Sequence, residues 1–264
     1  MKENNKKVLK IVGVVAAILC LIALIVFVIP KKEEEPKEDP PKEEVKEDEE
    51  EDTEEQEEIV GNPIDFAYWK SVNEDVYAYI QIADTNVDYP ILQSATDDSY
   101  YLNHTIDHVE GYPGSIYTER VNAKDFSDFN TLIYGHDMKD GSMFKHLHKF
   151  EDKEFFDTHD TVMIYTENEI RTYRVYAAVI YDDRHIMYHY DNDDIADRKA
   201  FIQSLQDVAG AGSFFREGMT IDENSKLITM STCISGKPNN RYIVVAAEVA
   251  VEQVTQTNIE KADS

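Results

Sequence analysis

The sequence contains little cysteine, which limits how the chain can be cross-linked. Only Cys20 and Cys233 occur among its 264 residues. Cys20 lies in the apolar stretch 11–29, which is predicted to be embedded in a membrane, so the two sulfur atoms cannot meet in a disulfide. Cys233 must therefore be explained either by its chemistry or by its packing.

Basic residues are scarce as well. The chain has 26 Lys and Arg against 53 Asp and Glu, a formal net charge of −27 at pH 7. A surface of this sign repels phosphate groups, so nucleic acid is not expected as a partner. Some histidine pairs have ligand-like spacing, but none is joined by a cysteine or a convincing acidic partner, and no metal site is expected. These pairs are His104 and His108, His146 and His148, and His185 and His189.

One long apolar run predicts a membrane anchor near the N-terminus. Residues 11–29 carry no charge, and as a helix they would span roughly 28 Å, close to the hydrocarbon thickness of a bilayer. Four lysines precede the run and acidic residues follow it. The positive-inside rule therefore predicts a single-pass anchor in the cell membrane over residues 1–30, with a cytoplasmic N-terminus and an extracellular remainder. A cleaved signal peptide is the alternative, although no small-x-small site ends the run.

The segment that follows has the composition of a spacer. Residues 31–58 contain five lysines and seventeen acidic residues, a net charge of 5 − 17 = −12. Such a segment cannot bury enough apolar surface to offset its ordering entropy. We expect a disordered acidic stalk over residues 31–60, one folded domain over 61–251 and a polar tail over 252–264.

The folded domain is expected to be mainly β. Segments rich in Val, Ile, Tyr and Thr and bounded by Gly, Asn and Asp predict strands, which cover residues 87–93, 115–118, 131–135, 161–166, 170–181, 226–232 and 241–251. Apolar residues at helical spacing predict a first helix over 64–79 that packs on the sheet. A second helix is capped by Asp193 or Asp194 and stops at Gly210. The pattern indicates a β-barrel with helical insertions.

Cys233 can act as a nucleophile only as a thiolate, which needs a nearby imidazolium, a cationic side chain or a helix N-terminus. His136 follows the predicted strand at 131–134 and the hinge-like Gly135, where its side chain can project into a cleft. Arg241 opens the strand after the loop 234–240, so a hairpin returns it beside Cys233. A guanidinium there could donate to a developing oxyanion or hold a substrate carbonyl. Taken one at a time, a buried core thiol, a loop histidine and a surface arginine remain open interpretations.

Three motifs in one chain resemble the sortases, and specifically the class B sortases. They are Tyr134-Gly135-His136-Asp137-Met138, Ser231-Thr232-Cys233 and Arg241. Residues 86–91 and 114–117 look like early strands of that family, and residues 141–144 like its stretch after the histidine. The helix over 194–209, between two late strands, is what separates class B from simpler sortases. The resemblance implies the family's closed β-barrel, with a substrate groove beside these residues.

The resemblance also implies roles for individual residues. Cys233 would be the nucleophile, His136 its acid/base partner and Arg241 the group that orients substrate and stabilises the oxyanion. Ser231 and Thr232 would line the groove, although as strand residues they could equally be structural. No acidic residue occurs in the loop 234–240, so no aspartate from this loop is given a catalytic role.

The reaction implied is transpeptidation on secreted surface proteins that bear a C-terminal sorting signal. Cys233 would attack the Thr carbonyl of an NPxT-type signal, and a peptidoglycan amine would resolve the thioester without metal or organic cofactor. A cysteine peptidase or hydrolase that passes the acyl group to water is one alternative. A non-catalytic, membrane-tethered binding domain is another, and it predicts a buried Cys233.

Overall fold

The structure, a computed structural model, describes residues 61–255. The predicted membrane helix, the acidic stalk and residues 256–264 of the tail lie outside these residues. No helix within residues 61–255 is long and apolar enough to cross a membrane. The elements in chain order are α2 (Phe66–Val72), β1 (Val76–Gln81), β2 (Asp88–Leu92), η1 (Tyr100–Leu102), β3 (Ile116–Tyr117), β4 (Asn130–Tyr134), η2 (Phe144–Glu151), α3 (Lys153–Thr158), β5 (Thr161–Tyr165), β6 (Glu169–Asp182), α4 (Ile186–His189), α5 (Ile195–Asp207), β7 (Phe214–Phe215), β8 (Leu227–Cys233) and β9 (Asn240–Gln253).

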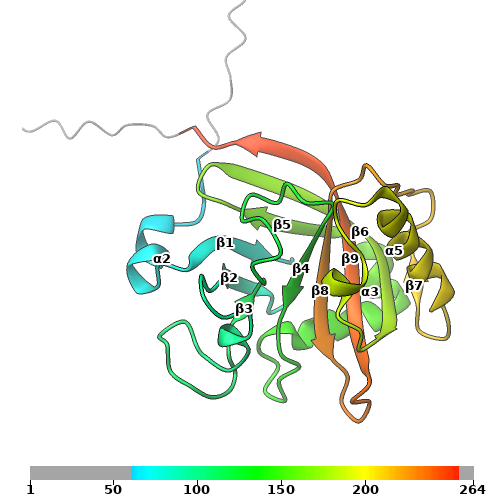
Figure 1. Cartoon of the computed structure of the whole chain (residues 1–264), viewed down its shortest axis with the longest axis horizontal. Helices are drawn as coiled ribbons and strands as arrows, with labels where there is room; N and C mark the ends of the chain where they lie inside the picture. Colours follow the sequence, from blue (N-terminus) through cyan, green and yellow to red (C-terminus); the bar gives the residue numbers. More distant parts are fainter. Residues whose placement is uncertain (1–60, 256–264) are drawn as a thin grey trace, which may run out of the picture. The chain divides into compact units, whose positions relative to one another are not determined.

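Eight of the strands close into a barrel (Figure 1). Their order is β5-β1-β2-β3-β4-β8-β9-β6, and pairing of β6 with β5 completes the ring, while β7 adds to the outer edge of β6. The pairs β2–β3 and β4–β8 are parallel and the others are antiparallel. Closure leaves no exposed sheet edge in the ring. The expectation of a closed, mainly β barrel is confirmed.

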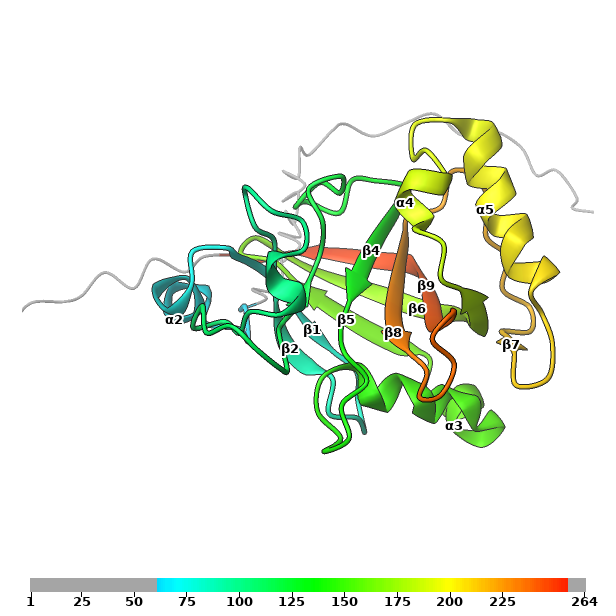
Figure 2. The same ribbon diagram turned by 60° about the horizontal axis from the view of Figure 1, so that its bottom comes forward.

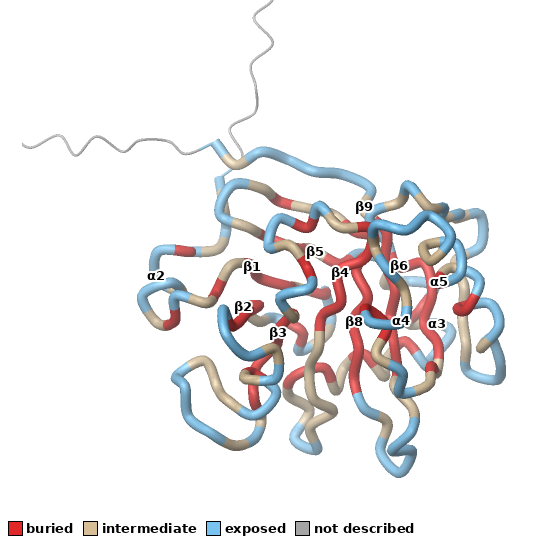
Figure 3. Tube along the Cα trace, viewed as in Figure 1, coloured by how far each residue is buried: buried red, intermediate tan, exposed pale blue. Residues whose placement is uncertain are grey.

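Successive apolar side chains of a strand point alternately into the barrel, where they form its core, and to its outer face. On β8, Ile228 and Met230 join the interior core, whereas Leu227 packs outside with Ile243 and Val245 of β9. This is the period of two expected of a strand buried on both faces. Buried residues accordingly follow the strands, and exposed residues gather in the loops (Figure 3).

Helices cover the outer faces of the barrel (Figure 2). α5 buries Phe201 and Leu205 against the outer faces of β4, β6, β8 and β9, and α2 packs Phe66 onto Tyr79 of β1. The Asp194 carboxylate caps α5 by accepting from the N–H groups of Ala196 and Asp197. The predicted helix between two late strands is confirmed, and each predicted strand is present within two residues at either end.

The predicted first helix over 64–79 is wrong in its second half. α2 ends at Val72, and the cap residue Asn73 has extended backbone angles of φ −153° and ψ 121°. The next residues form β1, which pairs with β2 and β5 on its two sides. Two ladders of backbone hydrogen bonds outweigh the helical spacing of Val76 and Tyr79. β1 and the short β7 are the strands that the sequence patterns did not predict.

Gly135 offers a test of how tightly the end of β4 is packed. A Cβ there would lie 2.5 Å from Cδ1 of Ile116 and 2.6 Å from Cγ of Phe144, and both side chains are buried. We expect Gly135→Ala to destabilise the fold by about 1–3 kcal/mol and to lower Tm by several degrees. Gly210→Ala is the matched control, because its Cβ would meet only the Val208 carbonyl oxygen at 3.9 Å. Equal melting temperatures for the two variants would contradict this view of the packing.

Candidate active site

Cys233 is the last residue of β8 and the exposed one. The six residues before it in the strand are buried, whereas the Cys233 thiol is free and exposed. β4 and β9 hold β8 from both sides, so the thiol stands on a rigid support at the rim of the barrel. The burial predicted by the non-catalytic alternative is not observed.

The strand register brings Arg241 beside the thiol. Cys233 pairs directly with Arg241 of β9, and Ser231 pairs with Ile243 of β9 and Tyr134 of β4. Directly paired residues share a face of the sheet, so these side chains occupy the outer face of the barrel. The predicted hairpin return of Arg241 to the cysteine is confirmed.

His136 reaches the same rim from β4. Because β4 and β8 are parallel, their C-terminal ends lie together, and His136 follows Tyr134 by the same step of two that separates Cys233 from Ser231. Nε2 of His136 lies 2.6 Å from the carbonyl oxygen of Leu102. A carbonyl oxygen only accepts, so Nε2 carries a proton and Nδ1 is the nitrogen that can gain or lose one.

A cavity of about 210 Å³ joins these residues. Its lining comprises Leu102, Tyr117, Tyr134, Gly135, His136, Ser231, Thr232, Cys233 and Arg241. All five residues predicted for the site therefore border one cavity. Ser231 and Thr232 differ in orientation, because Thr232 follows Met230 on the strand face that packs in the barrel interior. Substrate in the cavity would meet the side chain of Ser231 and the backbone of Thr232.

Leu102, Tyr117 and Tyr134 are cavity residues that sequence reasoning assigned no role. The rings of Tyr117 and Tyr134 stack with centroids 5.2 Å apart. Burial, followed by the charge of Glu119, raises the pKa of both phenols above the usual range. The two tyrosines therefore stay neutral at physiological pH and present an uncharged aromatic wall to the cavity.

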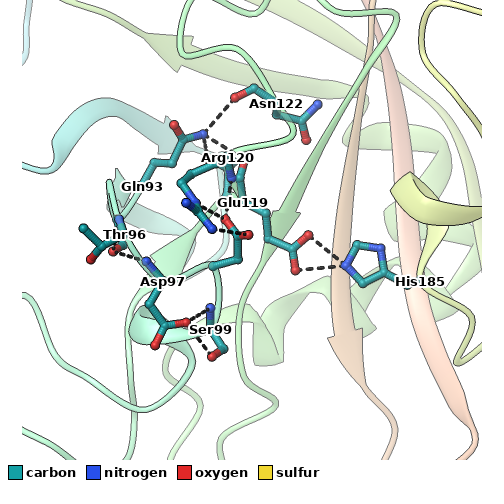
Figure 4. Close-up of polar contacts among 11 residues, drawn as sticks. Gln93, Thr96, Asp97, Ser99, Glu119, Arg120, Asn122 and His185 are labelled. Carbon is teal, nitrogen blue, oxygen red and sulfur yellow. Dashed lines mark hydrogen bonds and ion pairs between the residues drawn. The ribbon is translucent and has the colours of Figure 1, made fainter.

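A second hollow adjoins the cavity, with which it shares Tyr134, Ser231 and Arg241, and it is also lined by Ile186 at the start of α4. His185 fixes the start of α4, since its Nε2 lies 2.8 and 3.0 Å from the two carboxylate oxygens of Glu119 (Figure 4). Glu119 follows β3. This contact ties the helical insertion to the barrel next to the second hollow.

A histidine of η2 contacts the backbone at the end of β8 that carries Cys233. Nε2 of His148 lies 3.0 Å from the Cys233 carbonyl oxygen, and Nδ1 of His148 lies 2.6 Å from Oε1 of Glu151.

Asp137 is next to His136 in sequence but pairs with another residue, because its Oδ1 lies 2.9 Å from the Lys145 ammonium. Within residues 61–255, no carboxylate forms a hydrogen bond or ion pair with His136.

The site thus combines an exposed thiol, an imidazole and a guanidinium at one rim of a closed barrel. Acyl transfer through a thioester requires a nucleophile, a proton carrier and an oxyanion donor, and these three groups could supply them. Fold and site together define a closed β-barrel protein with a cysteine, a histidine and an arginine suited to acyl transfer.

Comparisons with known proteins agree. The sortase domain model matches residues 80–249. Sortase B of Listeria monocytogenes is 34% identical over 170 residues, which span 64% of this chain and 66% of that protein, just under two thirds of its length. The crystal structure of Clostridium perfringens sortase B superposes with a TM-score of 0.62 at 25% identity, over 70% of this chain and 99% of the other. Sortase B of B. anthracis gives 0.61 at 28% identity, over 70% and 83%.

The chain belongs to the sortase family, and its relatives are class B members. The resemblance inferred from the three motifs is confirmed.

Proposed function

We propose that the protein is a membrane-anchored sortase that joins secreted surface proteins to the cell wall. Cys233 cleaves a C-terminal sorting signal of the NPxT type after its threonine, and an amine of peptidoglycan takes over the acyl group. The observation that carries this proposal is the single cavity that gathers Cys233, His136 and Arg241 from three separate segments.

The chemistry follows from the three side chains. The Cys233 thiolate attacks the threonine carbonyl carbon, and the negative charge that develops on oxygen meets the Arg241 guanidinium. The C–N bond breaks as His136 delivers a proton to the leaving amine, which leaves a thioester. An incoming amine forms the new amide bond, and the electron pair of the C–S bond returns to sulfur.

The second hollow, the family resemblance and the N-terminal sequence support the choice of substrate and place. The second hollow, which adjoins the Cys233 cavity, offers room for residues before the scissile bond, and the resemblance to class B sortases implies an NPxT-type signal. The apolar run at residues 11–29 and the acidic segment after it favour an active site tethered outside the cell membrane, where secreted proteins and wall precursors meet.

The test uses full-length protein with quenched fluorescent NPxT-type and LPxTG-type peptides, with and without amide-capped triglycine. We expect cleavage of the NPxT-type peptide and a peptide–triglycine product in the mass spectrum. Cleavage that yields only the carboxylic acid at saturating amine would support a hydrolase instead. Preference for the LPxTG-type peptide would overturn the proposed signal.

A further inference from the structure

A separate hollow of about 440 Å³ lies against His136 and does not include Cys233. Its walls include Ser99, Leu102, Asn103, Glu110, Tyr112 and His136. His136 and Leu102 also border the cavity that contains the thiol. The imidazole therefore stands between two hollows, one with the nucleophile and one without it.

The loop between η1 and β3 forms the far wall of this hollow, and its backbone is well fixed. Gly111 N–H donates to the Asn103 carbonyl at 2.6 Å, and Ser115 N–H donates to the Tyr101 carbonyl at 2.9 Å. Gly114 has φ +66°, and a Cβ there would lie 2.5 Å from the Leu102 carbonyl oxygen. Close packing of the loop on η1 thus holds the wall in place.

The chemistry of this wall suits a cation. Glu110 is exposed, and within residues 61–255 it forms no ion pair or side-chain hydrogen bond, so its carboxylate is available. Tyr112 is 78% exposed, and its ring centroid lies 4.9 Å from that of His136. A carboxylate and an aromatic face are the two groups that attract an ammonium ion at a protein surface.

We propose that this hollow is the entry site for the acceptor amine, with Glu110 and Tyr112 holding its ammonium beside His136. The inference rests on the proposed transpeptidation and names where its second substrate binds. The geometry has a chemical logic, since the amine that attacks the thioester must exchange a proton with the same imidazole that served the leaving amine.

Amide formation releases Cys233 as a thiolate. The bound ammonium first loses one proton to water. Its nitrogen lone pair then forms the C–N bond with the thioester carbon, while the electron pair of the C–S bond leaves with Sγ of Cys233 as thiolate. The surplus proton on the new amide nitrogen passes to Nδ1 of His136, which restores the thiolate and imidazolium pair.

The negative charge of Glu110 should therefore strengthen binding of the acceptor amine and have no effect on thioester formation. We expect Glu110→Gln in the full-length protein to raise about fivefold the concentration of amide-capped triglycine that gives half-maximal ligation. Peptide cleavage without amine should keep its wild-type rate, because no ammonium takes part in thioester formation. Ligation to hydroxylamine, which is uncharged near neutral pH, should also be unchanged.

Asp107→Asn is the matched control, because Asp107 is an exposed carboxylate of the same loop that does not line the hollow. Equal triglycine dependence for Glu110→Gln and the wild type would overturn the acceptor site. A wild-type protein that cleaves the peptide and never ligates it would instead contradict the transpeptidation itself.

A binding measurement tests the site without turnover. In the Cys233→Ala variant, amide-capped triglycine at millimolar concentration should shift the backbone NMR signals of residues 110–112. Adding Glu110→Gln should weaken these shifts at equal ligand concentration. Shifts that are absent in the first variant, or equal in both, would contradict the assignment.

Discussion

Replacing Cys233 with alanine is expected to reduce peptide cleavage by the full-length protein at least about a thousandfold. The variant lacks the Cys233 sulfur atom, so nothing can attack the threonine carbonyl carbon to form the thioester. The fold should survive, since the Cys233 side chain is exposed and such substitutions rarely change stability by more than about 0.5 kcal/mol. Activity and thermal unfolding should be measured on the same preparation.

Cys20→Ala is the control for this experiment, because Cys20 is the other cysteine of the chain. We expect it to retain cleavage and to form the same acyl adduct, which mass spectrometry should locate on Cys233 in the wild type. A folded Cys233→Ala protein that cleaves at more than a few per cent of the wild-type rate would rule out the proposed nucleophile.

The sequence allowed the site to be predicted where chemistry and strand pattern are local. Cys233 and Arg241 flank one short loop between two apolar segments, so a hairpin pairing follows from spacing alone. His136 directly follows a predicted strand, but its place beside Cys233 depends on the parallel pairing of β4 with β8. That pairing joins segments about a hundred residues apart, and the resemblance to sortases supplied what the spacing could not.

The error at β1 has a physical cause. Both faces of this strand are covered, because Ala78 and Ile80 face the interior core while Tyr79 packs against Phe66 of α2. A strand buried on both sides lacks the polar alternation that identifies strands. The residual spacing of three and four residues between apolar positions then imitates a helix.

Other site residues act through groups that leave no sequence signal. Leu102 contacts His136 through its carbonyl oxygen, which every residue possesses. His148 contacts the Cys233 carbonyl oxygen from η2, whereas the sequence showed only its ligand-like spacing from His146, from which no metal site was expected. Such roles depend on how distant segments pack, and a single sequence does not reveal this packing.

Arg241→Lys is expected to lower kcat/KM for the signal peptide about a hundredfold, although the positive charge is kept. Nη1 of Arg241 donates to the carbonyl oxygens of Pro238 and Asn240 at 3.0 and 2.9 Å, which fixes the guanidinium in its hairpin. Nε and Nη2 form no hydrogen bond within the described part of the chain, so their N–H groups remain for the oxyanion and a substrate carbonyl. A lysine ammonium has three donors at one point and cannot serve both sets of acceptors.

Arg174→Lys provides the matched control, because it makes the same change at an exposed arginine of β6 that pairs with Asp160 at 2.7 Å. Arg174 lines neither the Cys233 cavity nor the second hollow beside it. It should leave cleavage unchanged. The loss in Arg241→Lys should lie mainly in kcat, since the oxyanion exists only as the transition state forms. If kcat is preserved and KM alone rises, Arg241 binds substrate without stabilising the oxyanion, and its role reduces to holding a ground-state carbonyl.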